Sequence, residues 1–499
     1  MKSVITIGTL LEKIESRLSR HPINKSSNTK VAVAALGALG IRNFPRVPCT
    51  TQQMLGLMKG CDIVPPRQRA SWAQRHRLGQ IAAEADNGIY RPHHPFVALR
   101  IYGPLDLPAL AKAWIRVQKR HPVLLCGFDM SDATWRLDAP AGVTDLVITD
   151  ATPSGGADTA RRLMEQLVDA PFDCTAGPLA RLVVLRCPEQ TLFALVLDHL
   201  VGDFWSLEVL MRDLTASYAE ELGLETRPLP PVTFPFPDQV RDQNAYLDSP
   251  AGRQALKRLA ETLKDVGPIP ETRFAGFTGA GSASYDRTGL IRHTFGNELT
   301  QAVSTYSRAS RMSPWTVIHA ALHRSLYDLC EQSAIGTTLM TANRESRSVH
   351  QTVGFLAGKV VVATKRGRTT TTDFLQEFQR AVATALDYTA IPWPRLLAHM
   401  DPKAFGRHSR APYISFNPQT TSMRRWLGTW QFTNCKTAPL HLTGSTPDAA
   451  IVMSLTELDK DIEVLLSHKL DWYPTRVIEL LWQTVEQTLW DWVRKPGSR

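Results

Sequence analysis

The segment Leu192–Ser206 reads LFALVLDHLVGDFWS and carries the most information about the fold. It opens with a continuous apolar run, which is typical of a strand buried on both faces. Beyond Ser206, apolar residues recur every three or four positions, which predicts an amphipathic helix with Ser206 as its N-cap. His199 and Asp203 are therefore expected in the loop between strand and helix, where proteins often hold functional side chains.

The chain has 499 residues, of which 43% are hydrophobic, and this length suits two domains. We predict an N-terminal extension or docking module over 1–60, an N-terminal lobe with the loop over 61–235, and a C-terminal lobe over 236–499. The boundary follows from Pro228–Pro237, where closely spaced prolines exclude a regular helix. One helical segment is expected over 238–264.

Composition excludes several classes of protein. No apolar run approaches the ~20 residues that span a bilayer. The N-terminus also lacks the basic, apolar and small-residue regions that follow one another in a signal peptide. We therefore expect a cytoplasmic protein without a membrane span. The seven cysteines include no Cys-x-x-Cys pair, which argues against a zinc cluster or a disulfide framework. The net charge of +10 is dispersed along the chain, so nucleic acid is not expected, whereas an acidic protein or a phosphate-bearing arm would suit it.

The loop residues allow more than one chemistry. Asp198, His199 and Asp203 are metal-ligating types, but no second histidine follows at a ligand spacing, so no metal site is predicted. His93 and His94, between two prolines, are predicted to be an ordinary loop pair. The chain contains no Gly-x-Ser-x-Gly nucleophile elbow. Acid–base chemistry at His199 and a purely structural loop remain as interpretations.

The loop resembles the active-site motif of the condensation domains of nonribosomal peptide synthetases, His-His-x-x-x-Asp-Gly, which is often followed by x-Ser. His199, Asp203 and Ser206 match the second histidine, the aspartate and the serine. Asp198 replaces the first histidine, and Phe204 replaces the glycine. Further similar blocks follow the family's order, at Leu99–Asp106, Arg120–Leu124, Pro171–Asp173, Gly177–Arg181, Thr341–Arg344, Val353–Leu356, Ile391–Trp393 and Ile414–Asn417.

The resemblance implies a mixed α/β (α+β) fold of two chloramphenicol acetyltransferase-like lobes, arranged as a V-shaped pseudo-dimer with an active-site tunnel between them. It also implies an acyltransferase of natural-product biosynthesis that forms no covalent acyl-enzyme. The acyl group would pass from the phosphopantetheine thioester of an acyl or peptidyl carrier protein to an amine or hydroxyl acceptor, small or carrier-bound. No intrinsically bound cofactor is expected. The alternatives are a non-catalytic recruitment domain and an ester-forming acyltransferase that uses acyl-coenzyme A.

His199 is the predicted catalytic residue, because neutral imidazole near pH 7 can take the proton of an attacking acceptor. The resemblance implies that Asp203 turns inward and holds the loop through a salt bridge to an arginine, for which Arg344 is the candidate. Asp198 is a candidate to support the loop or to cap the strand end. Phe204 and Ser206 are candidates to line the substrate channel. Core packing is the alternative for Phe204.

Overall fold

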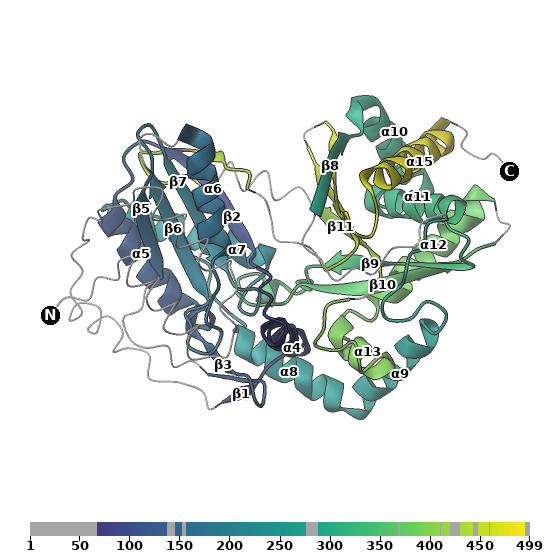
Figure 1. The fold of residues 1–499 in the computed structure, drawn as a ribbon, viewed down its shortest axis with the longest axis horizontal. Helices are drawn as coiled ribbons and strands as arrows, with labels where there is room; N and C mark the ends of the chain where they lie inside the picture. Colours follow the sequence, from purple (N-terminus) through teal and green to yellow (C-terminus); the bar gives the residue numbers. More distant parts are fainter. Residues whose placement is uncertain are drawn as a thin grey trace. The chain divides into compact units, whose positions relative to one another are not determined.

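The computed structural model describes residues 67–136, 145–151, 156–275, 288–367, 370–409, 411–419, 430–442, 448–458 and 460–494. The predicted N-terminal module over 1–60 lies outside these residues. The fold is mixed α/β, as predicted, and the chain divides into two compact units (Figure 1). Among the described residues, the first unit contains those up to Asp242 together with 344–356 and 430–442, and the second contains the remaining segments.

The units differ from the predicted lobes, because the expected C-terminal lobe, 236–499, gives its first residues up to Asp242 and two later segments to the first unit. The segment Arg344–Leu356 is held there by hydrogen bonds to Asp203. The other segment contributes strand β12 (Lys436–Pro439), which pairs antiparallel with β2 (Phe96–Tyr102). Both attachments join residues far apart in the sequence, so a linear division of the chain does not find them.

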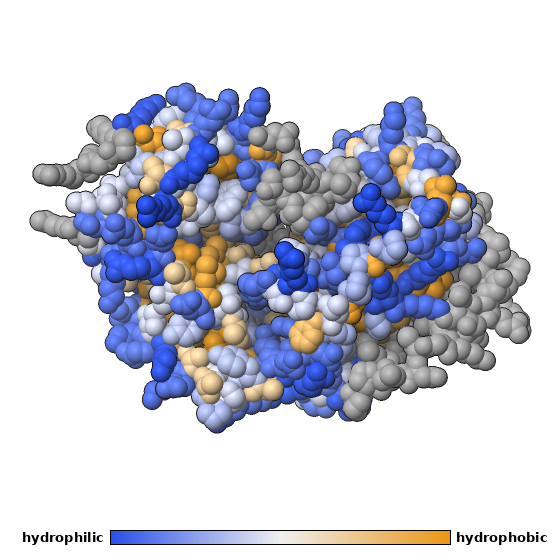
Figure 2. Space-filling view, turned by 180° about the vertical axis from the view of Figure 1, so that it is seen from behind, coloured by the Kyte–Doolittle hydropathy of each residue, from blue (hydrophilic) through white to orange (hydrophobic). Residues whose placement is uncertain are grey.

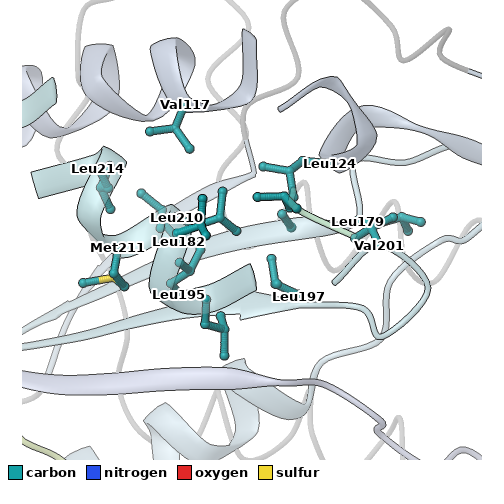
Figure 3. Packing of buried hydrophobic residues seen from close by; sticks show 14 of the residues in the cluster. Val117, Leu124, Leu179, Leu182, Leu195, Leu197, Val201, Leu210, Met211 and Leu214 are labelled. Carbon is teal, nitrogen blue, oxygen red and sulfur yellow. The ribbon is translucent and has the colours of Figure 1, made fainter. Parts of the chain in front are cut away.

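The central sheet of the first unit has the strand order β12-β2-β7-β6-β5. Its inner strands are almost entirely apolar because helices cover both faces. Helices α5 and α7 pack on one face, and α6 packs on the other. Figure 3 shows side chains of α5 and α7 packed against those of β6 and β7. The elements are β5 (Leu146–Asp150), β6 (Ala180–Arg186), β7 (Thr191–Leu197), α5 (Leu107–Arg120), α6 (Gly156–Asp169) and α7 (Phe204–Glu221).

Smaller elements complete the first unit. They are helix α4 (Trp72–Asp86), the 3-10 helix η1 (Pro122–Leu125), and a sheet of β1 (Gln68–Arg69), β4 (Thr134–Arg136) and β3 (Gly127–Asp129).

The helical segment expected over 238–264 is two helices, α8 (Phe236–Asp248) and α9 (Pro250–Thr262). The break lies at Ser249, whose side chain caps α9 by accepting a hydrogen bond from the Gly252 amide.

The second unit is built around a sheet with the order β10-β9-β11-β13-β14-β8. Its strands are β8 (Thr288–Thr294), β9 (Ala334–Thr341), β10 (Gly358–Lys365), β11 (Ile414–Gln419), β13 (Ile451–Glu457) and β14 (Ile462–Lys469). Its helices include α10 (Gly296–Ser310), α11 (Pro314–Leu329), α12 (Thr371–Leu386), α13 (Trp393–Met400) and α15 (Thr475–Arg494). The 3-10 helix η2 (Arg347–Val349) belongs to the first unit.

Helix α11 carries two buried histidines, His319 and His323, which are 1% and 0% exposed. Both rings contact the Thr337 hydroxyl, at 2.6 and 2.8 Å. Burial lowers the pKa of His323 to about 3, and burial together with the neighbouring His323 lowers the pKa of His319 well below its ordinary value. Both histidines are therefore neutral in the folded chain.

This pair predicts a loss of stability in acid. Because the folded-state pKa values lie below the unfolded value, the stabilisation is complete above about pH 6.5 and is lost as the pH falls. Between about pH 7 and pH 5.5, urea unfolding should show a loss of roughly 1 kcal/mol for each histidine. In His319→Gln/His323→Gln this part of the pH dependence should disappear. An unchanged pH profile in the double variant would contradict the assignment.

Surface hydropathy and helix composition both relate to the prediction that the chain has no membrane span. In the view of Figure 2, hydrophilic residues predominate and hydrophobic residues occupy smaller patches. Within the described ranges, no helix combines the length and the apolar composition needed to cross a bilayer.

Candidate active site

The candidate site is the turn between β7 and α7. After β7 ends at Leu197, the Asp198 carboxylate accepts a hydrogen bond from the Leu200 amide at 2.9 Å, and the Val201 amide donates to the Asp198 carbonyl at 3.1 Å. Leu200 and Val201 are fully buried in the core between the sheet and the helices. The turn is therefore fixed by apolar anchors and by a side-chain bond of Asp198, which caps the strand end.

The N-cap of α7 is Asp203, and the prediction of Ser206 was wrong. The Asp203 carboxylate accepts hydrogen bonds from the Ser206 amide at 2.9 Å and from its hydroxyl at 2.8 Å. Aspartate and serine are both good N-caps, so the sequence pattern allows either. The helix thus begins at Phe204, directly after the cap.

Asp203 and Arg344 form a buried ion pair in the first unit. Two guanidinium nitrogens reach the two carboxylate oxygens at 2.9 and 3.0 Å, and each side chain is 1% exposed. The Leu356 amide donates a further hydrogen bond to this carboxylate at 3.0 Å. Asp203 therefore connects the start of α7 with both ends of the segment Arg344–Leu356.

Ser206 lies within this network and is fully buried. Besides its bonds to Asp203, its hydroxyl lies 3.1 Å from both the amide and the carbonyl of Gly354. A Cβ at Gly354 would lie 2.1 Å from the Phe236 ring, so glycine is needed for this close approach. Because its hydroxyl is engaged and shielded, we assign Ser206 to support of the loop, which corrects the expectation that it lines a substrate channel.

His199 projects from the middle of the turn and is partly exposed. Its ring contacts Phe355, with centroids 4.1 Å apart, and His93, with centroids 4.7 Å apart. Burial lowers the pKa of the His199 ring, while the Asp203 carboxylate acts in the opposite direction. Nδ1 is buried without a partner at hydrogen-bonding geometry, and the backbone carbonyls of His199 and Gly202 also oppose the lowering of the ring's pKa. A neutral imidazole in this position suits a proton acceptor.

The other candidates occupy different environments. Phe204 is 40% exposed at the first position of α7, which excludes the alternative that it packs in the core. Asp198 is 5% exposed and contacts the backbone of its own turn. Within the described residues, no group of three or more histidine, cysteine or acidic side chains is arranged to hold a metal ion.

Three residues near His199 were missed by the sequence reasoning. The Gln74 amide on α4 donates a hydrogen bond to the Leu200 carbonyl at 2.8 Å, which braces the turn. His93 and Phe355 contact the His199 ring, yet both come from segments distant in the sequence. The paired histidines between prolines were a visible signal, but nothing in the sequence placed them beside β7.

Comparison with known proteins defines the family. The family model of the condensation domain matches residues 91–498. The chain belongs to the condensation-domain family. The matched residues include the complete turn from Asp198 to Ser206 as well as Arg344, so the predicted family resemblance is confirmed.

Curated relatives of this condensation domain are nonribosomal peptide synthetases. Chondramide synthase CmdD of Chondromyces crocatus is 24% identical over 451 residues, which cover 88% of this chain and 11% of the synthase. Phosphinothricin tripeptide synthetase PhsC of Streptomyces viridochromogenes is 29% identical over 314 residues, covering 60% of this chain and 28% of that synthetase. The chain thus spans only a small part of these relatives.

Solved structures confirm the fold class of this condensation domain. The X-domain from teicoplanin biosynthesis has a TM-score of 0.75 at 19% identity, covering 87% of this chain and 97% of that domain. The condensation domain from the monacolin K polyketide synthase MokA has a TM-score of 0.71 at 17% identity, covering 87% of this chain and 99% of that domain.

Proposed function

We propose that this condensation domain transfers an acyl group from the phosphopantetheine thioester of a carrier protein to an amine or hydroxyl acceptor. The observation that carries this proposal is the neutral, partly exposed imidazole of His199, held on a turn that the Asp203–Arg344 ion pair braces. A rigid turn of this kind favours catalysis because a positioned base needs little reorganisation as the reaction proceeds.

The proposed step is direct. The acceptor nitrogen or oxygen forms a bond to the thioester carbonyl carbon, and the carbon–sulfur bond breaks. His199 takes the acceptor's proton at Nε2 and returns it to the departing thiolate, so no covalent acyl-enzyme forms. Asp203 and Arg344 act on this step only through the position of the turn, because both side chains are almost completely buried.

An intact-mass assay tests the proposal. Carrier proteins loaded with acyl-phosphopantetheine are incubated with the protein and a panel of amines and alcohols, and acyl-coenzyme A is supplied separately as an alternative donor. We expect deacylated carrier and a new amide or ester only when protein and acceptor are both present. Transfer from acyl-coenzyme A alone would instead support the ester-forming acyltransferase.

Recruitment of another protein is the second candidate, and the exposed aromatic ring of Phe204 favours it. Large exposed apolar side chains suit protein contacts as well as substrates. One fold neighbour, the teicoplanin X-domain, is described in complex with OxyB. A stable complex with a carrier or enzyme partner, without transfer to any acceptor, would support recruitment and overturn the catalytic proposal.

Phe204 also gives a prediction about substrate range. Phe204→Ala should change the free energy of unfolding by no more than about 0.5 kcal/mol, since the ring is exposed. If the ring limits the space beside His199, the variant should accept bulkier acyl groups. Competition between short and branched acyl thioesters, followed by product mass, measures this change. An identical product ratio in wild type and variant would exclude Phe204 as a specificity residue.

A further inference from the structure

Two aromatic side chains contact the ring of His199, and the backbone carbonyls of His199 and Gly202 also act on it. Phe355 meets the ring at an interplanar angle of 38°, and His93 meets it nearly edge-on at 71°. Nδ1 is buried without a partner at hydrogen-bonding geometry. The orientation of the imidazole therefore depends on ring packing together with the backbone of its own turn, and not on a hydrogen bond from Nδ1 to an orienting side chain.

Phe355 is fixed from both sides along the chain. The Gly354 amide donates to the Ser206 hydroxyl at 3.1 Å, and the Leu356 amide donates to the Asp203 carboxylate at 3.0 Å. With both neighbours bound to the first turn of α7, the Phe355 ring is directed onto His199. The buried ion pair thus influences the position of the His199 ring through Phe355.

His93 is fixed by the backbone of the neighbouring strand. The His199 amide donates to the His93 carbonyl at 3.3 Å, and the Leu197 amide donates to the Pro95 carbonyl at 2.9 Å. These bonds continue the pairing of β2 with β7 beyond the end of the ladder. Pro92 and Pro95 restrict the backbone on either side of His93.

We propose that His93 and Phe355 are positioning residues that form an aromatic clamp on the His199 imidazole. This inference rests on the proposed catalytic function. Asp198 occupies the place of the motif's first histidine, and its carboxylate binds the Leu200 amide of its own turn. The clamp holds the His199 ring through two other segments of the chain. This explains how His199 keeps its orientation although position 198 is an aspartate.

The test compares His93→Ala and Phe355→Ala with His93→Phe, which keeps an aromatic ring. The alanine variants should lower kcat about tenfold, equivalent to ~1.4 kcal/mol of activation free energy, with little change in KM. His93→Phe should restore most of kcat. His399→Ala on α13 removes an exposed histidine and serves as the matched control. A general structural defect would instead lower the unfolding midpoint and would not be rescued by phenylalanine.

A second readout does not require activity. Carbethoxylation of His199 by diethylpyrocarbonate, followed by peptide mass spectrometry, reports how firmly the ring is held. Both alanine variants should react several-fold faster than wild type, and His93→Phe should react at nearly the wild-type rate. Unchanged reaction rates in the alanine variants would overturn the clamp. If wild type transfers no acyl group but the rates change as expected, the clamp stands and the proposed function fails.

Discussion

Replacing Asp203 with alanine is expected to lower the free energy of unfolding by about 3–5 kcal/mol, because the Arg344 guanidinium then stays buried without its counter-charge. The pair is almost completely shielded from solvent, with each side chain 1% exposed. The same substitution removes the N-cap of α7 and the acceptor of the Leu356 amide. Urea unfolding followed by circular dichroism measures the loss.

Charge-removing variants separate the ion pair from the cap. Asp203→Asn keeps the side-chain size and an oxygen for the Ser206 amide but removes the charge. Arg344→Met removes the other charge while retaining an apolar side chain of similar length. Combining the two should restore part of the stability that each alone loses, since no uncompensated charge remains. Strict additivity, or a loss below about 1 kcal/mol in Asp203→Ala, would contradict a stabilising buried pair.

The turn between β7 and α7 was predictable because its signals are local. A continuous apolar run predicts the buried strand, and apolar periodicity predicts the helix, so His199 was expected in the connecting loop. The predicted start of α7 was less accurate, since Asp203 and Ser206 are both suitable N-caps. The N-cap is the residue whose side chain accepts a hydrogen bond from a backbone amide of the first helical turn. Only the three-dimensional structure shows that this residue is Asp203.

The surroundings of His199 were not predictable from single residue patterns. His93 and Phe355 reach the ring through strand pairing and through hydrogen bonds to α7. Contacts of this kind join distant segments, and neither hydrophobic periodicity nor a short motif specifies them. The exposure of Phe204 likewise depends on its place as the first residue of α7 and on which segments lie beside it, and hydrophobic periodicity specifies neither.

Replacing His199 with alanine is expected to slow acyl transfer by roughly 10²–10⁴-fold, the usual contribution of a positioned general base. The effect on stability should be smaller than that of Asp203→Ala, because the His199 side chain is partly exposed and lies outside the ion-pair network. His199→Gln is a useful companion, since glutamine retains polarity but has no basic nitrogen. Both variants should remain folded while losing activity.

The single-turnover rate of acyl transfer from a saturating acyl-carrier protein, measured for wild type and His199→Ala in parallel, tests the catalytic role most directly. We predict a rate at least about 10²-fold lower in the variant, with a urea midpoint close to that of wild type. A folded His199→Ala variant that forms product at the wild-type rate would contradict general-base catalysis by His199.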